Sequence, residues 1–448
     1  MIEFIITLGW FLLSLGILIT FHEFGHFWVA RRFGVRVLRF SVGFGRPLWR
    51  RYGRDGTEYV LAAIPLGGYV KMLDEREQAV APADRAQAFN RQSVWARIAI
   101  VAAGPIANLI LAVAAFWLMF VIGKPDFKPV IAEPTGIAQA AGLKDGDELV
   151  EIAGQPIKVW SQATIELVRL AIARNDVPVV VRQADGDLLR VILPVSRIAR
   201  GVDERQALRE LGVQPKLPSA PAVVGRLSGG RPAALAGLEV GDEIAAINGA
   251  PVADFAALVE LIQREAGKAA PLELQVRRAG SNRTITLTAE PETGTDGKPR
   301  FVIGIGPIDT RDALLRYSPL AAVPAALRET WHLSTTTLEV LGRMLVGHAS
   351  LQNIAGPVGI AQITDSSASM GLAWFLSFLA LMSLSIAILN LLPIPILDGG
   401  HLMYYFIELL KGSPVSERVM LAGNYVGLVL LAGLMCLAFF NDFTRLFG

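Results

Sequence analysis

Four long apolar stretches constrain the fold of this chain more than any other feature of its sequence. They lie within residues 1–30, 98–122, 372–400 and 419–440 and are almost free of charged side chains. An α-helix rises about 1.5 Å per residue, so about 20 such residues cross the roughly 30 Å hydrocarbon core of a bilayer. The whole chain is 52% apolar and only 18% charged, which is typical of membrane proteins. We therefore predict a polytopic α-helical membrane protein with four transmembrane helices.

The basic residues predict the orientation of these helices. The loop 31–97 is rich in arginine, and cytoplasmic loops retain Lys and Arg. We therefore expect 31–97 and 398–418 to be cytoplasmic, with both termini and the long segment 123–371 on the other side. Basic loops of this kind are topology signals, so they do not indicate nucleic acid as a partner.

The long segment 123–371 contains an internal repeat. Residues 141–149 read AGLKDGDEL and residues 236–244 read AGLEVGDEI. Each copy resembles the PDZ domain family, in which GLxxGD precedes a strand, and this resemblance predicts α+β domains over 127–215 and 220–309. PDZ domains bind extended peptides, often at a terminus, by adding a strand to a sheet edge. The alternative is that both domains are rigid spacers with empty grooves.

The segment 311–371 follows the repeats and leads to the third apolar stretch. Its apolar residues are spaced as on one face of a helix, for example Leu327, Trp331 and Leu338, which predicts an amphipathic helix. Such a helix can lie on the outer membrane surface, although a plain connector is equally compatible with the pattern.

The cytoplasmic loop contains an apolar segment, EYVLAAIPLGGYVKML, at residues 58–73. Two β-like stretches flank Pro65, Gly67 and Gly68, which predicts a β-hairpin turning at these residues. The segment is too apolar to stay in water, and non-helical backbone at membrane depth must be buried in protein or line a wet cavity. We therefore expect a membrane-associated hairpin that approaches the site described next.

The first apolar stretch ends in a cluster of ionisable residues, HEFGH, at residues 22–26. His22 and His26 lie four residues apart and so face the same side of a helix. This is the HExxH arrangement of zinc proteases, with two histidine ligands and a glutamate, here Glu23, as general base. The alternative is that these three ionisable residues have only a structural role. However, ionisable groups in a spanning helix cost several kcal/mol unless they meet a partner, an ion or a cavity.

A catalytic zinc needs a third protein ligand and an open position. The third apolar stretch ends in NLLPIPILDGG at residues 390–400, and we expect Asp398 to lie at the same membrane depth as the two histidines. Pro393 and Pro395 break the helix before it. Asp398 could instead cap a helix end, and His401 is a weaker ligand candidate.

The two motifs HEFGH and NLLPIPILDG, with tandem PDZ repeats between them, resemble the site-2 protease family of intramembrane zinc metalloproteases, and in particular its bacterial members. The likeness covers the whole chain. It implies one Zn²⁺ held by His22, His26 and Asp398, Glu23 as the base, and Asn390 as a polar group near the substrate or its oxyanion. It also implies that Gly43–Gly45 and the apolar hairpin hold substrate, for which the candidate residues are Gly67, Gly68, Tyr69, Val70, Lys71, Met72, Pro393 and Pro395.

This resemblance also implies a biological role. An enzyme of this kind cleaves single-span membrane proteins, such as an anti-sigma factor after a first cut outside the membrane, and signal-peptide remnants. It acts in the envelope stress response from the bacterial inner membrane, with the PDZ domains in the periplasm and the active site near the cytoplasm. Two rival functions remain: a PDZ scaffold with a structural zinc, and an ion or metal transporter. The first would need four closed ligands, and the four apolar stretches lack the repeat symmetry typical of the second.

Overall fold

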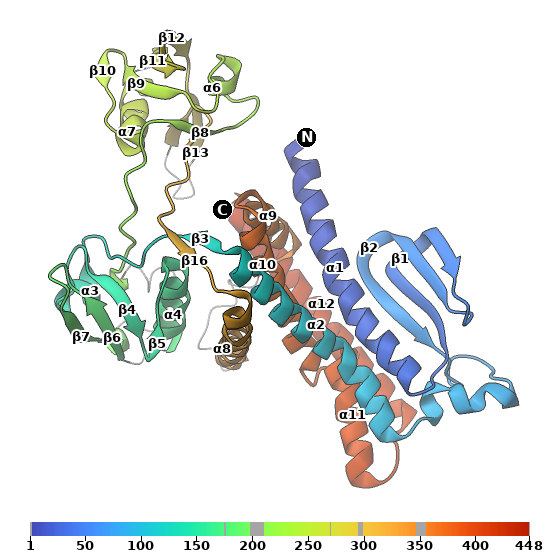
Figure 1. Ribbon diagram of the computed structural model, residues 1–448. Coiled ribbons are helices and arrows are strands. Elements are labelled where there is room, and N and C mark those ends of the chain that lie inside the picture. The colour runs from blue at the N-terminus through green and yellow to red at the C-terminus, as the bar shows by residue number, and fades with distance from the viewer. Residues whose placement is uncertain are drawn as a thin grey trace. The chain divides into compact units, whose positions relative to one another are not determined.

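The computed structural model describes residues 2–173, 176–197, 210–268, 270–293, 299–345 and 355–447. The chain forms two compact units. One contains Met1–Lys124 and Leu315–Gly448, and the other contains Pro125–Ile198 and Ala207–Leu314. Figure 1 shows the helices and strands of both units, coloured by their position along the chain. The first unit holds the long helices, and the second holds the repeats.

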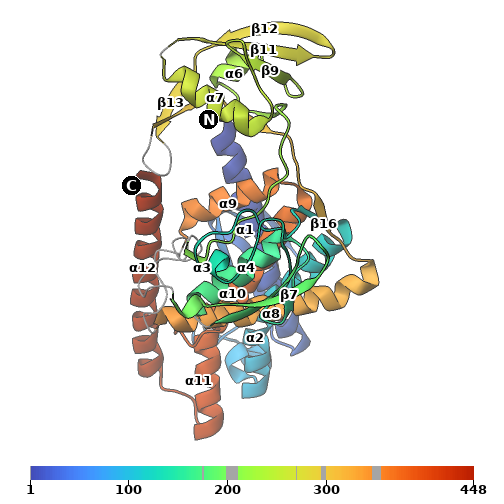
Figure 2. The same ribbon diagram turned by 90° about the vertical axis from the view of Figure 1, so that its left-hand side faces the viewer.

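Four helices of the first unit are long and apolar enough to cross a membrane, which confirms the four predicted spans by length and composition. α2 begins after Ser93, whose hydroxyl accepts a hydrogen bond from the Ala96 N–H, and ends before Gly123. α2 packs against both α1 and α10. Figure 2 shows α12 along its length. The four helices are α1 (Ile2–Arg32), α2 (Val94–Ile122), α10 (Leu372–Leu391) and α12 (Glu417–Phe447).

The third spanning helix is shorter than the sequence suggests. α10 ends at Leu391, and Asp398 begins a separate helix, α11 (Asp398–Lys411). Leu392 has extended backbone (φ −64°, ψ 143°) because the residue before a proline avoids the helical region. Within the link that follows, Ile396 has φ of +88°, which is rare for a β-branched residue. Asp398 is therefore placed by a strained turn and the first turn of a new helix.

The predicted hairpin segment forms β-structure, but its two stretches do not pair directly with each other. Residues 58–72 are β2 (Glu58–Met72), paired with β1 (Val37–Tyr52), and residues 53–57 connect the two. Residues 39–42 run parallel to 58–61 but antiparallel to 68–71, so the chain reverses direction between residues 61 and 68, the stretch that contains Gly67. Residues 39–42 of β1 pair with 58–61 and also with 68–71 of β2, so the end of β2 lies at an edge of this small sheet. The short 3₁₀ helices Pro82–Gln87 and Phe89–Arg91 lead from here to α2.

The second unit contains two copies of the same four-stranded sheet. The strand order is β5-β4-β6-β7 in the first copy and β10-β9-β11-β12 in the second. The first copy contains α3 (Gly136–Ala140), β4 (Glu148–Ile152), β5 (Gln155–Pro156), α4 (Trp160–Ala173), β6 (Val177–Arg182), β7 (Leu188–Leu193) and the 3₁₀ helix Val195–Arg197. The second contains β8 (Val224–Leu227), α6 (Pro232–Leu235), β9 (Glu243–Ile247), β10 (Ala250–Pro251), α7 (Phe255–Ala266), β11 (Leu272–Arg278), β12 (Ser281–Leu287), β13 (Glu290–Thr293), β14 (Pro299–Val302) and β15 (Ile305–Pro307).

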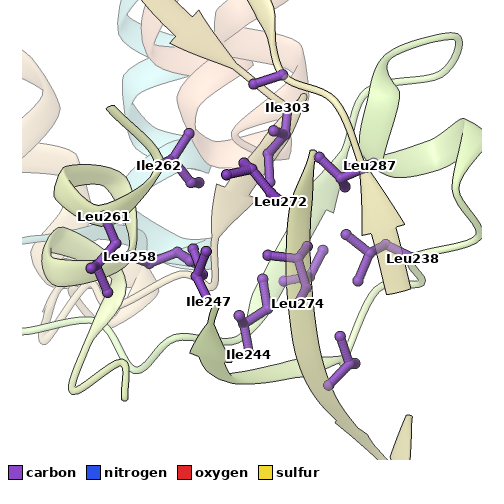
Figure 3. Packing of buried hydrophobic residues seen from close by; sticks show 14 of the residues in the cluster. Leu238, Ile244, Ile247, Leu258, Leu261, Ile262, Leu272, Leu274, Leu287 and Ile303 are labelled. Carbon is purple, nitrogen blue, oxygen red and sulfur yellow. The ribbon is translucent and has the colours of Figure 1, made fainter. Parts of the chain in front are cut away.

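The repeated motif GLxxGD forms the same turn in both copies. The second glycine of each has a left-handed backbone, with φ of +89° at Gly146 and +97° at Gly241, a conformation that glycine adopts without strain. The following carboxylates, Asp147 and Asp242, each accept a 2.8 Å hydrogen bond from the N–H three residues earlier. In the second copy the strand after this turn enters a core in which Ile247, Leu258 and Leu274 meet (Figure 3).

The remaining elements precede the third spanning helix. β3 (Lys124–Asp126) pairs with β16 (Ala313–Leu315), and α8 (Pro319–Leu345) and α9 (Pro357–Ser369) follow. Residues 346–354 of the expected amphipathic segment lie outside the described residues. α8 exposes large apolar side chains, including 73% of Trp331 and 53% of Leu327. These side chains fit the interfacial helix expected from the sequence, which stays a prediction.

Candidate metal centre

Three side chains from two helices converge on one point inside the first unit. His22 and His26 lie one turn apart on α1, and Asp398 is the first residue of α11. One ligand atom from each residue lies within 4.8 Å of the others. The i, i+4 spacing brings the two rings together, and the break after α10 brings the carboxylate to them. The structure thus places together the three side chains that the sequence suggested as ligands.

The distances between these atoms match the geometry of a zinc site. The two Nε2 atoms are 3.3 Å apart, and Oδ2 of Asp398 is 3.2 Å from Nε2 of His22 and 3.5 Å from Nε2 of His26. Ligand atoms about 2.0–2.2 Å from a tetrahedral zinc ion lie roughly 3.3 Å apart. Oδ2 is moreover a buried oxygen without a satisfactory hydrogen-bond partner among the described residues. The donor set and its spacing therefore fit a zinc ion.

The second ring nitrogen of each histidine contacts α2. Nδ1 of His26 lies 2.9 Å from the carbonyl oxygen of Ile100, and Nδ1 of His22 lies 3.4 Å from the side-chain amide of Asn108. A histidine that binds a metal through Nε2 carries its proton on Nδ1, which needs an acceptor. The Ile100 carbonyl is one. The Asn108 amide oxygen, which is buried without a partner, becomes the other when the amide is turned, an orientation that coordinates alone do not fix.

Glycines allow α1 and α2 to approach this closely. A Cβ atom added at Gly104 would collide with Nε2 of His26 and lie 2.9 Å from Cε1 of His22. One added at Gly25 would collide with the carbonyl oxygen of Ala103. Gly104 and Asn108 were not among the candidate site residues predicted from the sequence. The available signal was an Asn and a Gly-Pro pair inside an otherwise apolar span.

Glu23 lies beside the three ligands, towards the end of β2. A Cβ atom at Gly68 would be 3.0 Å from Cγ of Glu23, and the backbone of Val70 lies near its carboxylate. Glu23 is not part of the ligand group. The arrangement places a carboxylate between a candidate metal site and an edge strand, where it can exchange protons with a group held at either.

The other sequence candidates lie outside the ligand group. Asn390 is in the last turn of α10 and makes no hydrogen bond to the cluster among the residues described. His401 is three residues beyond Asp398 on α11 and lines a neighbouring cavity instead. Pro393 and Pro395 lie in the link between α10 and α11. α12 packs closely on this link, because Gly427 has no side chain that would collide with the carbonyl oxygen of Pro395.

The chain is similar to known proteins along its full length. The model of peptidase family M50 matches residues 10–434. A protein of Xylella fastidiosa named as a zinc metalloprotease is 45% identical over 444 residues, which cover 98% of this chain and 99% of the relative. Proteins named "Regulator of sigma-E protease RseP", from Escherichia coli and Salmonella typhimurium, are 42% identical over 454 residues, which cover 100% of both chains.

Proposed function

The chain belongs to peptidase family M50 and is a zinc metalloprotease, and on this premise we propose that it cleaves single-span membrane proteins within the membrane. The observation that carries the proposal is the convergence of His22, His26 and Asp398 at zinc-binding distances between helices that are long and apolar enough to span a bilayer. A soluble substrate would not require ligands at this depth, where ionisable groups are costly.

We assign the following roles to the side chains at the site. His22, His26 and Asp398 hold one zinc ion, which supplies a Lewis acid able to lower the pKa of water and polarise a carbonyl. Glu23 accepts a proton from the attacking water and passes it to the leaving amine. Asn390 donates a hydrogen bond as negative charge develops on the carbonyl oxygen. Its place in the last turn of α10, eight residues before Asp398, supports this role.

The substrate must lose its helical hydrogen bonds before it can be cut. Residues 68–71 of β2 pair with β1 on one side, and no other strand among the described residues pairs with their other side. An unwound segment placed there would replace its lost helix bonds with sheet bonds. The contact between Val70 and Glu23 supports this, because a peptide on this edge passes directly by the base.

The relatives suggest the biological setting. Because relatives are named as regulators of sigma-E protease, we infer that the substrates include an anti-sigma factor, cut after a first cleavage outside the membrane, and signal-peptide remnants. The enzyme would lie in the bacterial inner membrane, with residues 31–97 and 398–418 cytoplasmic. The two repeats, as PDZ domains in the periplasm, would bind peptide termini and exclude substrates with bulky outer domains.

A cleavage assay tests the proposed function. The purified full chain is incubated with a single-span peptide that lacks an outer domain, with and without a zinc chelator. We expect cleavage within the spanning segment, loss of cleavage with chelator, and recovery when zinc is restored. Cleavage that persists after complete removal of zinc would contradict the proposal.

A further inference from the structure

A cavity of about 810 Å³ lies beside the candidate metal centre, within the first unit. Its walls are the last residues of β2, the loop that follows them, and the facing sides of α11 and α12. The volume is in the range of specific binding sites. None of the roles assigned above uses the side chains of α11 and α12 that line it, so the cavity has no function yet.

The cavity is continuous with the open edge of β2. Val70 lines it, and the backbone of the same residue lies near the carboxylate of Glu23. A strand added along residues 68–71 therefore passes the base near Gly68 and Val70. Beyond this point it runs along Lys71 and Met72 into the cavity. The cavity thus lies where one flank of a bound peptide has to go.

The interior of the cavity offers polar groups that lack partners. Tyr404 lines it and is only 6% exposed, yet its hydroxyl has no hydrogen-bond partner among the residues described. Oδ1 of Asn424, on the facing helix α12, is likewise buried without a hydrogen-bond partner among the residues described. Buried polar atoms without partners are uncommon and require an explanation. A peptide bound between β2 and these helices would supply one.

Negative charge dominates the part of the cavity that faces solvent. Glu77 and Glu417 line it and are exposed, and neither carboxylate makes a salt bridge to any residue that the structure describes. Arg76 is already paired with the buried carboxylate of Asp74 at 2.6 Å. Besides these two carboxylates, the lining contains one ammonium group, that of Lys71, and the ring of His401. A basic peptide therefore fits this lining better than an acidic one.

We propose that the cavity is a subsite for the flank of the substrate that extends from the cleaved bond towards the cytoplasm, and that Glu77 and Glu417 select Lys or Arg there. The inference rests on the proposed function and extends it to a sequence preference. The cavity lies among segments expected to be cytoplasmic. Membrane proteins concentrate Lys and Arg on that flank, so the charge of the cavity complements the charge that an ordinary single-span substrate carries.

A charge-exchange experiment tests this subsite. Two single-span peptides differ only in a cytoplasmic flank of three lysines or three glutamates, and the full-length enzyme is used as wild type and as the double variant Glu77→Lys, Glu417→Lys. We expect the wild type to prefer the lysine peptide, and the double variant to reduce or reverse this preference, by roughly 2- to 5-fold in kcat/KM per carboxylate. The matched control Glu260→Lys, an exposed position on α7, should leave the preference unchanged.

A second variant tests the buried hydroxyl group that lines the cavity. Tyr404→Phe removes only the unpartnered hydroxyl, so we expect it to raise KM for both peptides while kcat and zinc content stay the same. An unchanged lysine-to-glutamate ratio in the double variant, with active enzyme, would overturn the subsite. If the wild type cuts neither peptide, the proposed function fails, and the subsite fails with it.

Discussion

Nε2 of His22 lies 3.2 Å from Oδ2 of Asp398, although the two residues come from helices near opposite ends of the chain. The bond length of zinc to its ligands accounts for this spacing without any direct hydrogen bond between the two groups. The fold of the first unit, with α2 packed between α1 and α10, holds the two residues at this separation.

Asn108→Leu should weaken zinc binding without displacing any ligand. The variant keeps the branched shape and the number of heavy atoms of the side chain but removes the acceptor for Nδ1 of His22, and loss of such an outer partner typically costs about 10- to 100-fold in metal affinity. Competition with a chelator measures this affinity. Ser383→Ala is the control, because Ser383 hydrogen-bonds only the backbone carbonyl of Asn108; an equal loss of zinc affinity in both variants would contradict the role of the amide.

Gly104→Ala should disrupt the metal centre. Its methyl group would overlap the ring of His26, so α1 and α2 must separate or the ring must turn away from Asp398. We expect loss of both zinc and cleavage. Gly16→Ala on α1 adds the same methyl group where no atom lies within 4 Å, and it should retain both activities. A fully active Gly104→Ala variant would show that the packing of these helices is not what positions the ligands.

Glu23→Gln should separate zinc binding from catalysis. Glu23 lies outside the ligand group, so the variant should keep its zinc, while loss of a general base lowers kcat by about 10²- to 10⁴-fold. Zinc content and single-turnover cleavage are measured on the same preparation. A variant that loses its zinc would instead make Glu23 a ligand, and one that cleaves normally would exclude it as the base.

The second repeat should lose stability in acid in a way that depends on Arg278. Burial alone would raise the pKa of Asp242, but hydrogen bonds from Arg278 hold this pKa below its usual value. A lowered pKa stabilises the fold above the pKa of the unfolded state, about 3.9, and this stabilisation is lost as the pH falls through the folded-state pKa. The protection factors of the β9 and β11 amides against hydrogen exchange, measured in the full chain, should therefore fall below about pH 4.

Arg278→Leu tests the same pair at neutral pH. It leaves the carboxylate of Asp242, whose side chain is 1% exposed, without its cation, so this repeat should lose more stability than the loss of an exposed ion pair causes. Arg182→Leu is the matched control in the first repeat, since its partner Glu148 is exposed and such pairs contribute less than about 1 kcal/mol. Equal destabilisation of the two repeats would contradict this account.

The three candidate ligands could be predicted from the sequence, whereas the residues that support them could not. His22 and His26 can be recognised as a metal-binding pair by their spacing and because they are ionisable residues in an apolar helix. Asp398 can be recognised because it follows two prolines that break a helix. Ile100 contributes only a backbone carbonyl, which no side-chain pattern encodes. Asn108 is a single polar residue in a spanning helix, and its partner is evident only once α1 and α2 are packed together.

Gly68 has a further role that the sequence did not predict. Gly67 and Gly68 were interpreted as turn residues, and the chain does reverse direction between residues 61 and 68. A side chain at Gly68 would lie 2.8 Å from Cγ2 of Ile19 and 3.0 Å from Cγ of Glu23, so this glycine also permits the strand to approach α1. Only the packing of β2 against α1 reveals this close approach.

X-ray absorption at the zinc edge, recorded on the active full-length enzyme, tests the central claim most directly. The account predicts one zinc ion per chain, bound by two imidazole nitrogens at about 2.0–2.1 Å and by carboxylate and solvent oxygens at about 2.0–2.2 Å, with the Asp398→Ala variant losing an oxygen ligand and cleavage together. A zinc bound by four protein ligands, or an Asp398→Ala variant with an unchanged spectrum and full activity, would contradict it.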